Sequence, residues 1–425
     1  MRSTLPLTFA AIGVQRVASL AAGLGLHVLC ARMIGEDGYG RYAYWLTWVI
    51  ACAPVAMWGA RTAGVRQVSA YLATNEPELA AGFVRWSRQR LVLAGSMTAM
   101  VALLVLWLTG IIVDPFTAAA WIFALLGFAW FNAESAFLQG ADRVVLAQLV
   151  HSLARPLLII LSLGVVWWWQ LELEATSVLW IDAVACVAVA LLAWVTTRRF
   201  LPAAPVPAVD VREPWHRGAR MLVALSILGA VITEVDVLVI GLVVGDAETG
   251  AFFAAKRLVG FMGFALMVVN ITVAPRISAA HAREDHAELQ RLLRISVGLG
   301  TLAAVPVCAG LIIFGDSLLA IFGAAFTRAH GALGWMAVGQ LWSVVCGSVV
   351  YFLLMTHGEA LLIRLYLVVF CCKTAAVALF ASSHGIDGAA WGTVVGDVVL
   401  NTGAAWVIAR RYGRHTSLIA WVVRR

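Results

Sequence analysis

Charged side chains are scarce in this chain: Lys, Arg, Asp and Glu make up 12% of its 425 residues, whereas 62% are hydrophobic. A typical soluble domain has about 25% charged and about 45–50% apolar residues. A soluble fold could not bury this much apolar side chain, so the composition excludes a soluble enzyme, a nucleic-acid-binding domain and a disordered chain. It indicates an all-α polytopic membrane protein, because a transmembrane β-barrel needs alternating segments of about ten residues, which the sequence lacks.

Motifs that carry catalytic chemistry are also missing. The seven cysteines lie inside apolar runs, and their spacing fits neither a metal site nor a disulfide framework. The nine histidines are scattered, with no HExxH motif and no grouping with Ser and Asp. No loop is long enough to fold into a soluble catalytic domain. We therefore expect a protein that is not an enzyme, holds no metal or cofactor and binds no nucleic acid.

Long apolar runs fill the chain instead. A membrane-spanning helix needs about 20 apolar residues, and the sequence has room for about twelve. We expect them at about 7–32, 42–62, 91–112, 116–138, 144–168, 175–197, 219–243, 250–274, 292–314, 332–355, 360–382 and 386–409. Of the 30 Lys and Arg residues, 22 fall on the side that holds both termini and only 3 on the other. The positive-inside rule then places both termini in the cytoplasm.

The chain is expected to contain two related halves. A six-helix bundle at 1–200 is joined to a second one at 218–411 by a Pro-rich cytoplasmic linker at 201–217, and a cytoplasmic tail at 412–425 follows. At an offset of 210 residues, Gly35 aligns with Gly245 and Gly40 with Gly250. Because six spans is an even number, both halves enter the membrane from the same side, which predicts two parallel bundles of the kind that many transporters use.

Two stretches carry a resemblance to a known family. The run LCARMIGEDGYGRYAYWLTWVIACAPVAMWGARTAGVRQVSAY (29–71) resembles the first hairpin of polysaccharide exporters. The run TEVDVLVIGLVVGDAETGAFFAAKRLVGF (233–261) resembles their seventh and eighth helices. Both belong to the polysaccharide branch of the multidrug/oligosaccharidyl-lipid/polysaccharide (MOP) exporter superfamily. The chain is most similar to its O-antigen and exopolysaccharide repeat-unit flippases, and this implies two six-helix bundles around a central, often cationic, cavity in the bacterial inner membrane.

The resemblance also implies a function. Such flippases translocate an undecaprenyl-diphosphate-linked oligosaccharide, a repeat unit of O-antigen, exopolysaccharide or capsule, by alternating access. The implied partners are this lipid-linked oligosaccharide, membrane lipids and polysaccharide polymerase machinery. The alternative is a cation-coupled multidrug exporter of the same superfamily. Its bacterial members often hold the cation with a carboxylate in the first helix, and this chain has no Asp or Glu before Glu36.

Two arginines inside the expected spans are candidate ligands for the diphosphate. A charge at mid-bilayer costs about 2.5–3.5 kcal/mol on the insertion scale, so it is usually paired or functional. Neither Arg16 nor Arg155 has an acidic residue level with it across a neighbouring turn. Because guanidinium binds phosphate through paired hydrogen bonds, we expect both to line the cavity and to contact the diphosphate or acidic sugars. The alternative is pairing with a distant acid, such as Arg155 with Asp182.

A second group of charges lies in the hairpin at 233–261. Folding this hairpin about its turn brings Asp236 level with Arg257, and we expect a structural ion pair between them. Glu234 is expected either to pair with Lys256 or to face the cavity as a titrating carboxylate. Lys256 is also a candidate for contacting the substrate.

The last two spans carry Lys373 and Asp397, which fall nearly level across their turn. We expect an ion pair here too, with Lys373 a further candidate for substrate contact. The other interpretation is an ion-coupled switch: H⁺ or Na⁺ binding at Glu234, Asp236 or Asp397 would bias the two access states. Burial raises the pKa of a carboxylate and a nearby cation lowers it, so the sequence leaves both readings open.

Overall fold

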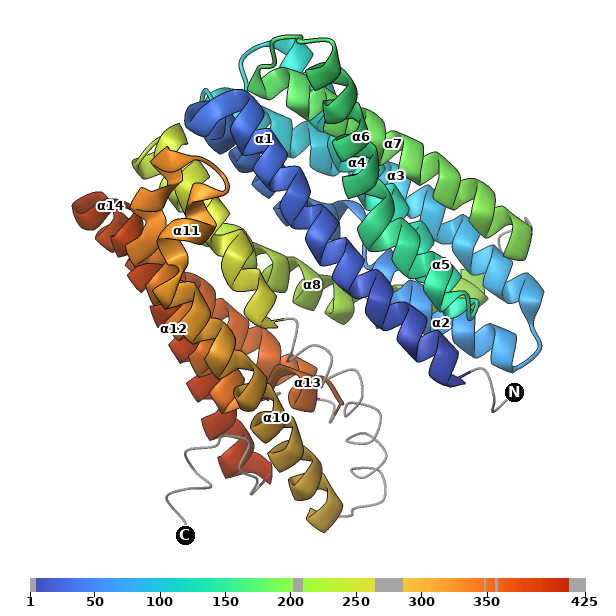
Figure 1. The fold of residues 1–425 in the computed structure, drawn as a ribbon. Coiled ribbons are helices and arrows are strands. Elements are labelled where there is room, and N and C mark those ends of the chain that lie inside the picture. Colours follow the sequence, from blue (N-terminus) through green and yellow to red (C-terminus); the bar gives the residue numbers. More distant parts are fainter. Residues whose placement is uncertain (1–4, 202–208, 264–285, 348, 356–357, 413–425) are drawn as a thin grey trace. The chain divides into compact units, whose positions relative to one another are not determined.

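The computed structural model describes residues 5–201, 209–263, 286–347, 349–355 and 358–412 (Figure 1). Throughout these ranges the regular elements are helices, which confirms the expected all-α class. The chain forms two compact units: Met1–Gly38 with Trp45–Ala230, and Tyr39–Tyr44 with Val231–Arg425. A six-residue piece of the first helix thus packs with the second unit.

The first unit is built from long helices joined by short turns. They are α1 (Leu5–Ala56), α2 (Ala60–Ala73), α3 (Pro77–Leu108), α4 (Pro115–Gly140), α5 (Val144–Gln148), the π-helical turn η1 (Leu149–Leu153), α6 (Ala154–Trp168) and α7 (Ala175–Phe200). Local signals set their starts. Asp114 caps α4 by accepting a 2.7 Å hydrogen bond from the backbone N–H of Thr117, and Pro115 occupies the first turn.

The expected linker at 201–217 is partly wrong. Helix α8 begins at Val209 and runs to Val243, so the second half of the segment is helical. Trp215 is buried in an aromatic cluster with Phe83 and Trp86, and its indole N–H donates a 2.6 Å hydrogen bond to the Tyr71 hydroxyl. These contacts hold the start of α8 in the first unit, which continues to Ala230. The expected tail at 412–425 lies almost entirely outside the described residues.

The second unit continues from α8 through a helical segment at 246–263. It also contains α10 (His286–Ile313), α11 (Gly315–Ala320), the 3₁₀ turn η2 (Ala324–Ala329), α12 (His330–Cys346), α13 (Val349–Met355) and α14 (Glu359–Tyr412). The side chain of Tyr39, in the α1 segment Tyr39–Tyr44, is fully buried and packs edge-on against Phe253 and Phe326.

The glycines aligned by the internal repeat share structural roles. Gly35 and Gly245 both have positive φ, 71° and 119°; Gly35 interrupts α1, and Gly245 lies in the turn after α8. Gly40 packs directly on the turn after α8: a Cβ added there would lie 1.7 Å from the Asp246 carbonyl oxygen and 3.0 Å from the Gly250 nitrogen. Only a residue without a side chain permits these conformations and this approach.

Eight helices among the described residues are long and apolar enough to cross a membrane. Two of them, with 44 and 53 residues, are about twice the length of one crossing. Each contains a non-helical glycine, Gly35 in α1 and Gly385 in α14, which divides it into two legs. The expected number of twelve spans stays a prediction.

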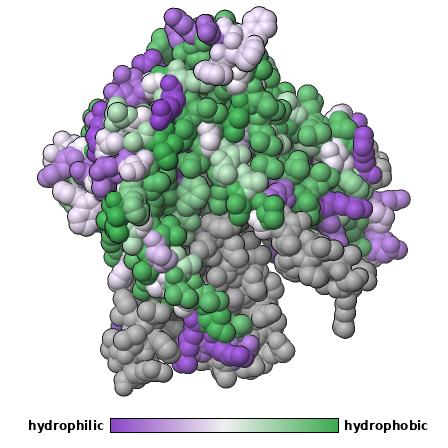
Figure 2. Space-filling view, in the orientation of Figure 1, coloured by the Kyte–Doolittle hydropathy of each residue, from purple (hydrophilic) through white to green (hydrophobic). Residues whose placement is uncertain are grey.

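The surface of the chain is that of a membrane protein. Hydrophobic residues make up most of the coloured surface in Figure 2, and hydrophilic residues gather toward its edges. Large apolar side chains such as Met97, Met100 and Leu302 are 64–74% exposed. Such exposure is unfavourable in water and expected in lipid, so the chain is a multi-pass membrane protein.

Candidate functional site

Arg155 is held by a carboxylate in the first unit. Its guanidinium donates two hydrogen bonds, of 2.7 and 2.6 Å, to the two carboxylate oxygens of Asp182, which joins α6 to α7. Asp182 is 1% exposed. The expected role of Arg155 as a diphosphate ligand is therefore not supported, and the alternative pairing with Asp182 is confirmed. Removing one partner of such a buried pair leaves an uncompensated charge, so a diphosphate would compete poorly for this guanidinium.

A second pair of the same kind joins α3 to α4. Arg88 donates hydrogen bonds of 2.7 and 2.8 Å to the two carboxylate oxygens of Glu134, which is 1% exposed. The sequence analysis did not predict this pair. Both pairs are bidentate ion pairs between neighbouring helices, and we assign them a structural role in the first unit.

Arg61, His151 and Arg16 lie near one another in the first unit. The Arg61 guanidinium donates a 3.0 Å hydrogen bond to Nε2 of His151, so this imidazole is neutral, and Arg16 lies near both side chains. Within the described ranges, the structure shows no carboxylate paired with Arg61. Arg16 is therefore placed beside two basic residues that the sequence analysis did not select.

Helix geometry brings these three residues together. Arg61 follows the bend at Trp58 and Gly59, where α1 ends and α2 begins. His151 lies in the π-helical turn η1, and such turns occur often at functional sites. Helix α1 packs on this region through a 3.0 Å contact between the hydroxyls of Ser19 and Ser152.

A pocket of about 310 Å³ opens beside Arg61. It is lined by the end of α1, the start of α2 and the α8 residues Ser226 and Ala230, all within the first unit. Helix α2 has no side-chain cap at its N-terminus, where Gly59 has φ 73°. Uncapped N–H groups at a helix start favour anions, so the arginine and the helix start both favour a negatively charged ligand.

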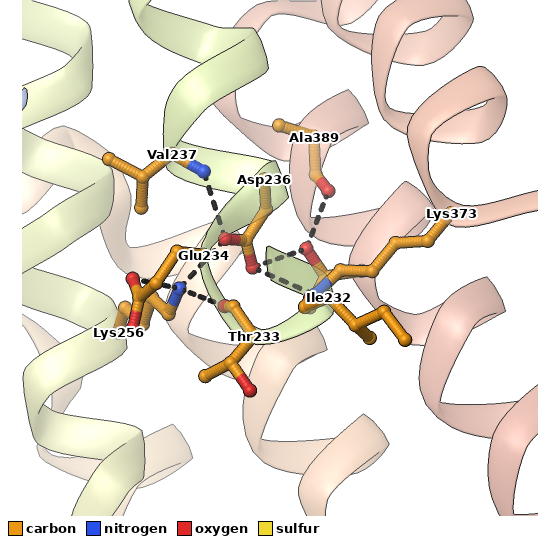
Figure 3. A network of polar contacts seen from close by, with 9 residues as sticks. Ile232, Thr233, Glu234, Asp236, Val237, Lys256, Lys373 and Ala389 are labelled. Atoms are coloured by element: carbon orange, nitrogen blue, oxygen red, sulfur yellow. Dashed lines mark hydrogen bonds and ion pairs between the residues drawn. The ribbon is translucent and has the colours of Figure 1, made fainter. Parts of the chain in front are cut away.

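A buried charge network lies in the second unit (Figure 3). The Asp236 carboxylate accepts hydrogen bonds from the ammonium of Lys256 at 2.7 Å, from that of Lys373 at 3.2 Å and from the Thr393 hydroxyl at 3.3 Å. Lys256 also donates to Glu234 at 3.1 Å, which agrees with one of the two expected alternatives for Glu234. Asp236 is 1% exposed. The network thus contains two ammonium groups and two carboxylates.

The expected ion pair between Asp236 and Arg257 is wrong. Lys256, one residue before Arg257, is the residue that pairs with Asp236. Neighbouring helix positions differ by about 100° around the axis, so only one of the two can face α8. The Arg257 guanidinium lies 4.3 Å from the centroid of the Phe253 ring instead.

The expected ion pair between Lys373 and Asp397 is also wrong. Lys373 donates to Asp236 and to the Ile232 carbonyl, at 2.9 Å. Its side chain lies along Gly396, where an added Cβ would meet its Cδ at 2.7 Å. The absence of a side chain there lets Lys373 reach α8. Among the described residues, no group of three or more His, Cys, Asp and Glu could hold a metal ion.

Comparisons with known proteins identify the family. The model of the polysaccharide biosynthesis protein family matches residues 9–281. The chain belongs to this family. The MatE family model matches residues 222–354. This is a family of transporters rather than enzymes, which confirms the expectation that the protein is not an enzyme.

Individual relatives agree with this assignment. The chain is 25% identical over 134 residues to a protein from Haloferax volcanii described as a probable low-salt glycan biosynthesis flippase, Agl15. That match spans 30% of this chain and 28% of the relative. An inward-facing multidrug MATE transporter of the MOP superfamily has a TM-score of 0.77 at 14% identity, covering 93% of this chain and 95% of the other. The lipid II flippase MurJ, in an inward closed conformation, has 0.70 at 12%, covering 93% and 87%. At these identities, the solved structures establish the MOP transporter fold.

Proposed function

We propose that this protein is a flippase for an undecaprenyl-diphosphate-linked oligosaccharide, a repeat unit of O-antigen, exopolysaccharide or capsule. It would move this substrate across the bacterial inner membrane, with both termini in the cytoplasm. The observation that carries the proposal is the basic group of Arg61 and His151, with Arg16 nearby, beside a pocket in the first unit.

The chemistry of this group fits a diphosphate. A guanidinium beside a pocket among membrane helices is stabilised by an anion, because charge interactions are strong where the dielectric constant is low. Arg61 is exposed, and its planar guanidinium can donate two parallel hydrogen bonds to phosphate oxygens. The start of α2 adds backbone N–H donors. The oligosaccharide would then occupy water-filled space while the lipid stays in the bilayer.

The proposal includes coupling of transport to H⁺ or Na⁺, and one carboxylate is the best candidate for this step. Asp236 is already matched by two ammonium groups, which favours a structural role for it and for Glu234. Asp397 forms none of the ion pairs of that network among the described residues and is half-buried in α14. We therefore place any titrating or ion-binding step at Asp397. Transport driven equally well with and without each ion gradient would contradict it.

The second candidate is a cation-coupled multidrug exporter, which the MatE match over residues 222–354 favours. A carboxylate beside the pocket would stabilise a cationic drug there. The pocket beside Arg61 offers an arginine instead.

Deleting the gene and analysing the lipid fraction by mass spectrometry tests the proposal. We expect an undecaprenyl-linked oligosaccharide to accumulate, and its mass would identify the glycan. Wild type and Arg66→Ala should clear it, whereas Arg61→Ala should not. Arg66 is a matched control because it is also exposed on α2 but does not line the pocket. Normal lipids combined with sensitivity to cationic dyes would favour the exporter.

A further inference from the structure

A second hollow in the first unit runs along α3. It is a groove of about 640 Å³ between the second half of α1 and α3, from Arg90 to Val105. At 1.5 Å per residue this stretch of helix is about 22 Å long. Ala94, Thr98 and Ala102 recur every four residues along it and leave room between the larger side chains. The lining is almost entirely apolar, so the groove suits one extended hydrocarbon chain.

One end of this groove is charged. Among the described residues that line it, Arg90 is the only one with a formal charge. Its guanidinium lies 5.8 Å from the centroid of the Trp86 ring, and the described ranges show no carboxylate paired with it. Arg88, two residues earlier, is tied to Glu134 instead. A guanidinium at the end of an apolar groove is complementary to a lipid with an anionic head.

The groove adjoins the pocket of Arg61. Trp58 and Arg90 also line a small hollow that includes Met57, and Met57 in turn lines the Arg61 pocket. The bend between α1 and α2 therefore borders all three spaces. Trp58 has φ 46°, a left-handed conformation that a bulky residue rarely adopts.

We propose that this groove binds the polyisoprenoid chain of the lipid-linked substrate, with the diphosphate at Arg90. The inference rests on the proposed function and adds a place for the lipid. The tail would lie along α3 on the first unit, and the head would pass the Trp58 bend to reach Arg61. A diphosphate carries more negative charge than a phospholipid diester, so Arg90 favours the diphosphate. The groove is a single channel along one helix, so it fits one polyisoprenoid chain better than the two acyl chains of a phospholipid.

Photo-crosslinking in nanodiscs of phosphatidylcholine tests the groove, with undecaprenyl diphosphate as the probe. A photo-reactive amino acid is placed at Met97, which lines the groove, or at Met100, which does not. The two methionines make a matched pair, because they lie three residues apart on α3 and are 64% and 67% exposed. We expect about tenfold more adduct at position 97.

The charged end is tested in the same assay. Arg90→Gln should lower the yield at position 97 about tenfold, the loss of one charge-assisted contact. Arg85→Gln, which removes an exposed charge from the same helix outside the groove, should leave it unchanged. With uncharged undecaprenol, Arg90→Gln should have no effect. Equal labelling at 97 and 100, or equal competition by phosphatidylglycerol, would overturn the proposal in favour of ordinary bilayer lipid.

The two proposals fail in different ways. If the chain is not this flippase, the deletion strain accumulates no lipid-linked oligosaccharide, whatever the crosslinks show. If only the groove assignment is wrong, wild type clears the accumulated lipid while the probe labels both positions alike. Replacing Met97 with Trp fills the groove without touching Arg61. It should slow clearance, whereas Met100→Trp should not.

Discussion

Lys373 in α14 forms an ion pair with Asp236 in α8, 137 residues earlier in the chain, with 3.2 Å between Nζ and Oδ2. Its side chain is 5% exposed. Together with Lys256, it supplies two positive charges to one buried carboxylate. The arrangement fastens α14 to α8 in the middle of the second unit.

Breaking this pair should destabilise the protein. Lys373→Met keeps the length of the side chain but leaves Asp236 with one ammonium partner. We expect a loss of about 3–5 kcal/mol, seen as a lower melting temperature in detergent. Arg291→Ala, which removes an exposed pair with Glu288, should cost less than about 1 kcal/mol. Equal effects of the two substitutions would show that the buried network is not structural.

Gly40 should not tolerate a side chain. In Gly40→Ala the new methyl group would meet the Asp246 carbonyl oxygen, and the backbones would have to separate. We expect a loss of about 1–3 kcal/mol in thermal unfolding. Gly298→Ala in α10 has open space around the added methyl and should instead stabilise by about 0.5–1 kcal/mol. A stable Gly40→Ala protein would contradict the close packing.

Asp114 should give a pH-dependent contribution at the start of α4. The Thr117 backbone N–H donates to its carboxylate and lowers the pKa of Asp114 below its ordinary value. A lowered pKa stabilises the fold above the unfolded pKa of about 3.9, and this contribution is lost as the pH falls through the folded value. At pH 7, Asp114→Ala should cost about 1 kcal/mol, and the difference from wild type should shrink below about pH 4. Asp114→Asn can still cap the helix and should show much less pH dependence. A difference that is constant from pH 7 to pH 3 would contradict this role.

Arg155 and Arg61 should differ in what their loss affects. Arg155→Ala leaves the buried Asp182 carboxylate without its partner and should lower the folded yield in the membrane. Arg61→Ala removes an exposed guanidinium and should keep the yield while abolishing clearance of the lipid-linked sugar. Quantitative immunoblotting alongside lipid analysis separates the two effects. A normal yield with lost transport in Arg155→Ala would return this residue to the substrate site.

The sequence predicted well which charged residues lie at the same depth along neighbouring helices. It predicted poorly which of them face one another. Counting from the turn brought Asp236 level with residues 256–258, because the position of a residue along a hairpin follows from residue number alone, and pairing with Lys256 was one of the two expected alternatives for Glu234. The partner of Asp236 depended on rotation about the axis, and there the choice between Lys256 and Arg257 went wrong. For Lys373, the deciding feature was the missing side chain at Gly396, which no count of spans can reveal.

The basic group of the first unit was missed for a different reason. Arg61 directly follows a long apolar run, within the last residues of the expected span 42–62, where an arginine is typical of the membrane boundary. The Trp58-Gly59 pair that ends this run is a turn signal, and it could have placed Arg61 in the first turn of a new helix. His151 had no signal of its own, because its contact with Arg61 joins residues 90 positions apart.

Translocation in reconstituted vesicles tests the central claim most directly. Purified protein is placed in vesicles loaded on one leaflet with the undecaprenyl-diphosphate-linked oligosaccharide isolated from the deletion strain, and a glycosidase reports the sugar that reaches the other leaflet. We predict that wild type and Arg66→Ala expose the sugar, whereas Arg61→Ala behaves like protein-free vesicles. Wild-type vesicles that expose no more sugar than protein-free ones, or an Arg61→Ala protein as active as wild type, would contradict the account.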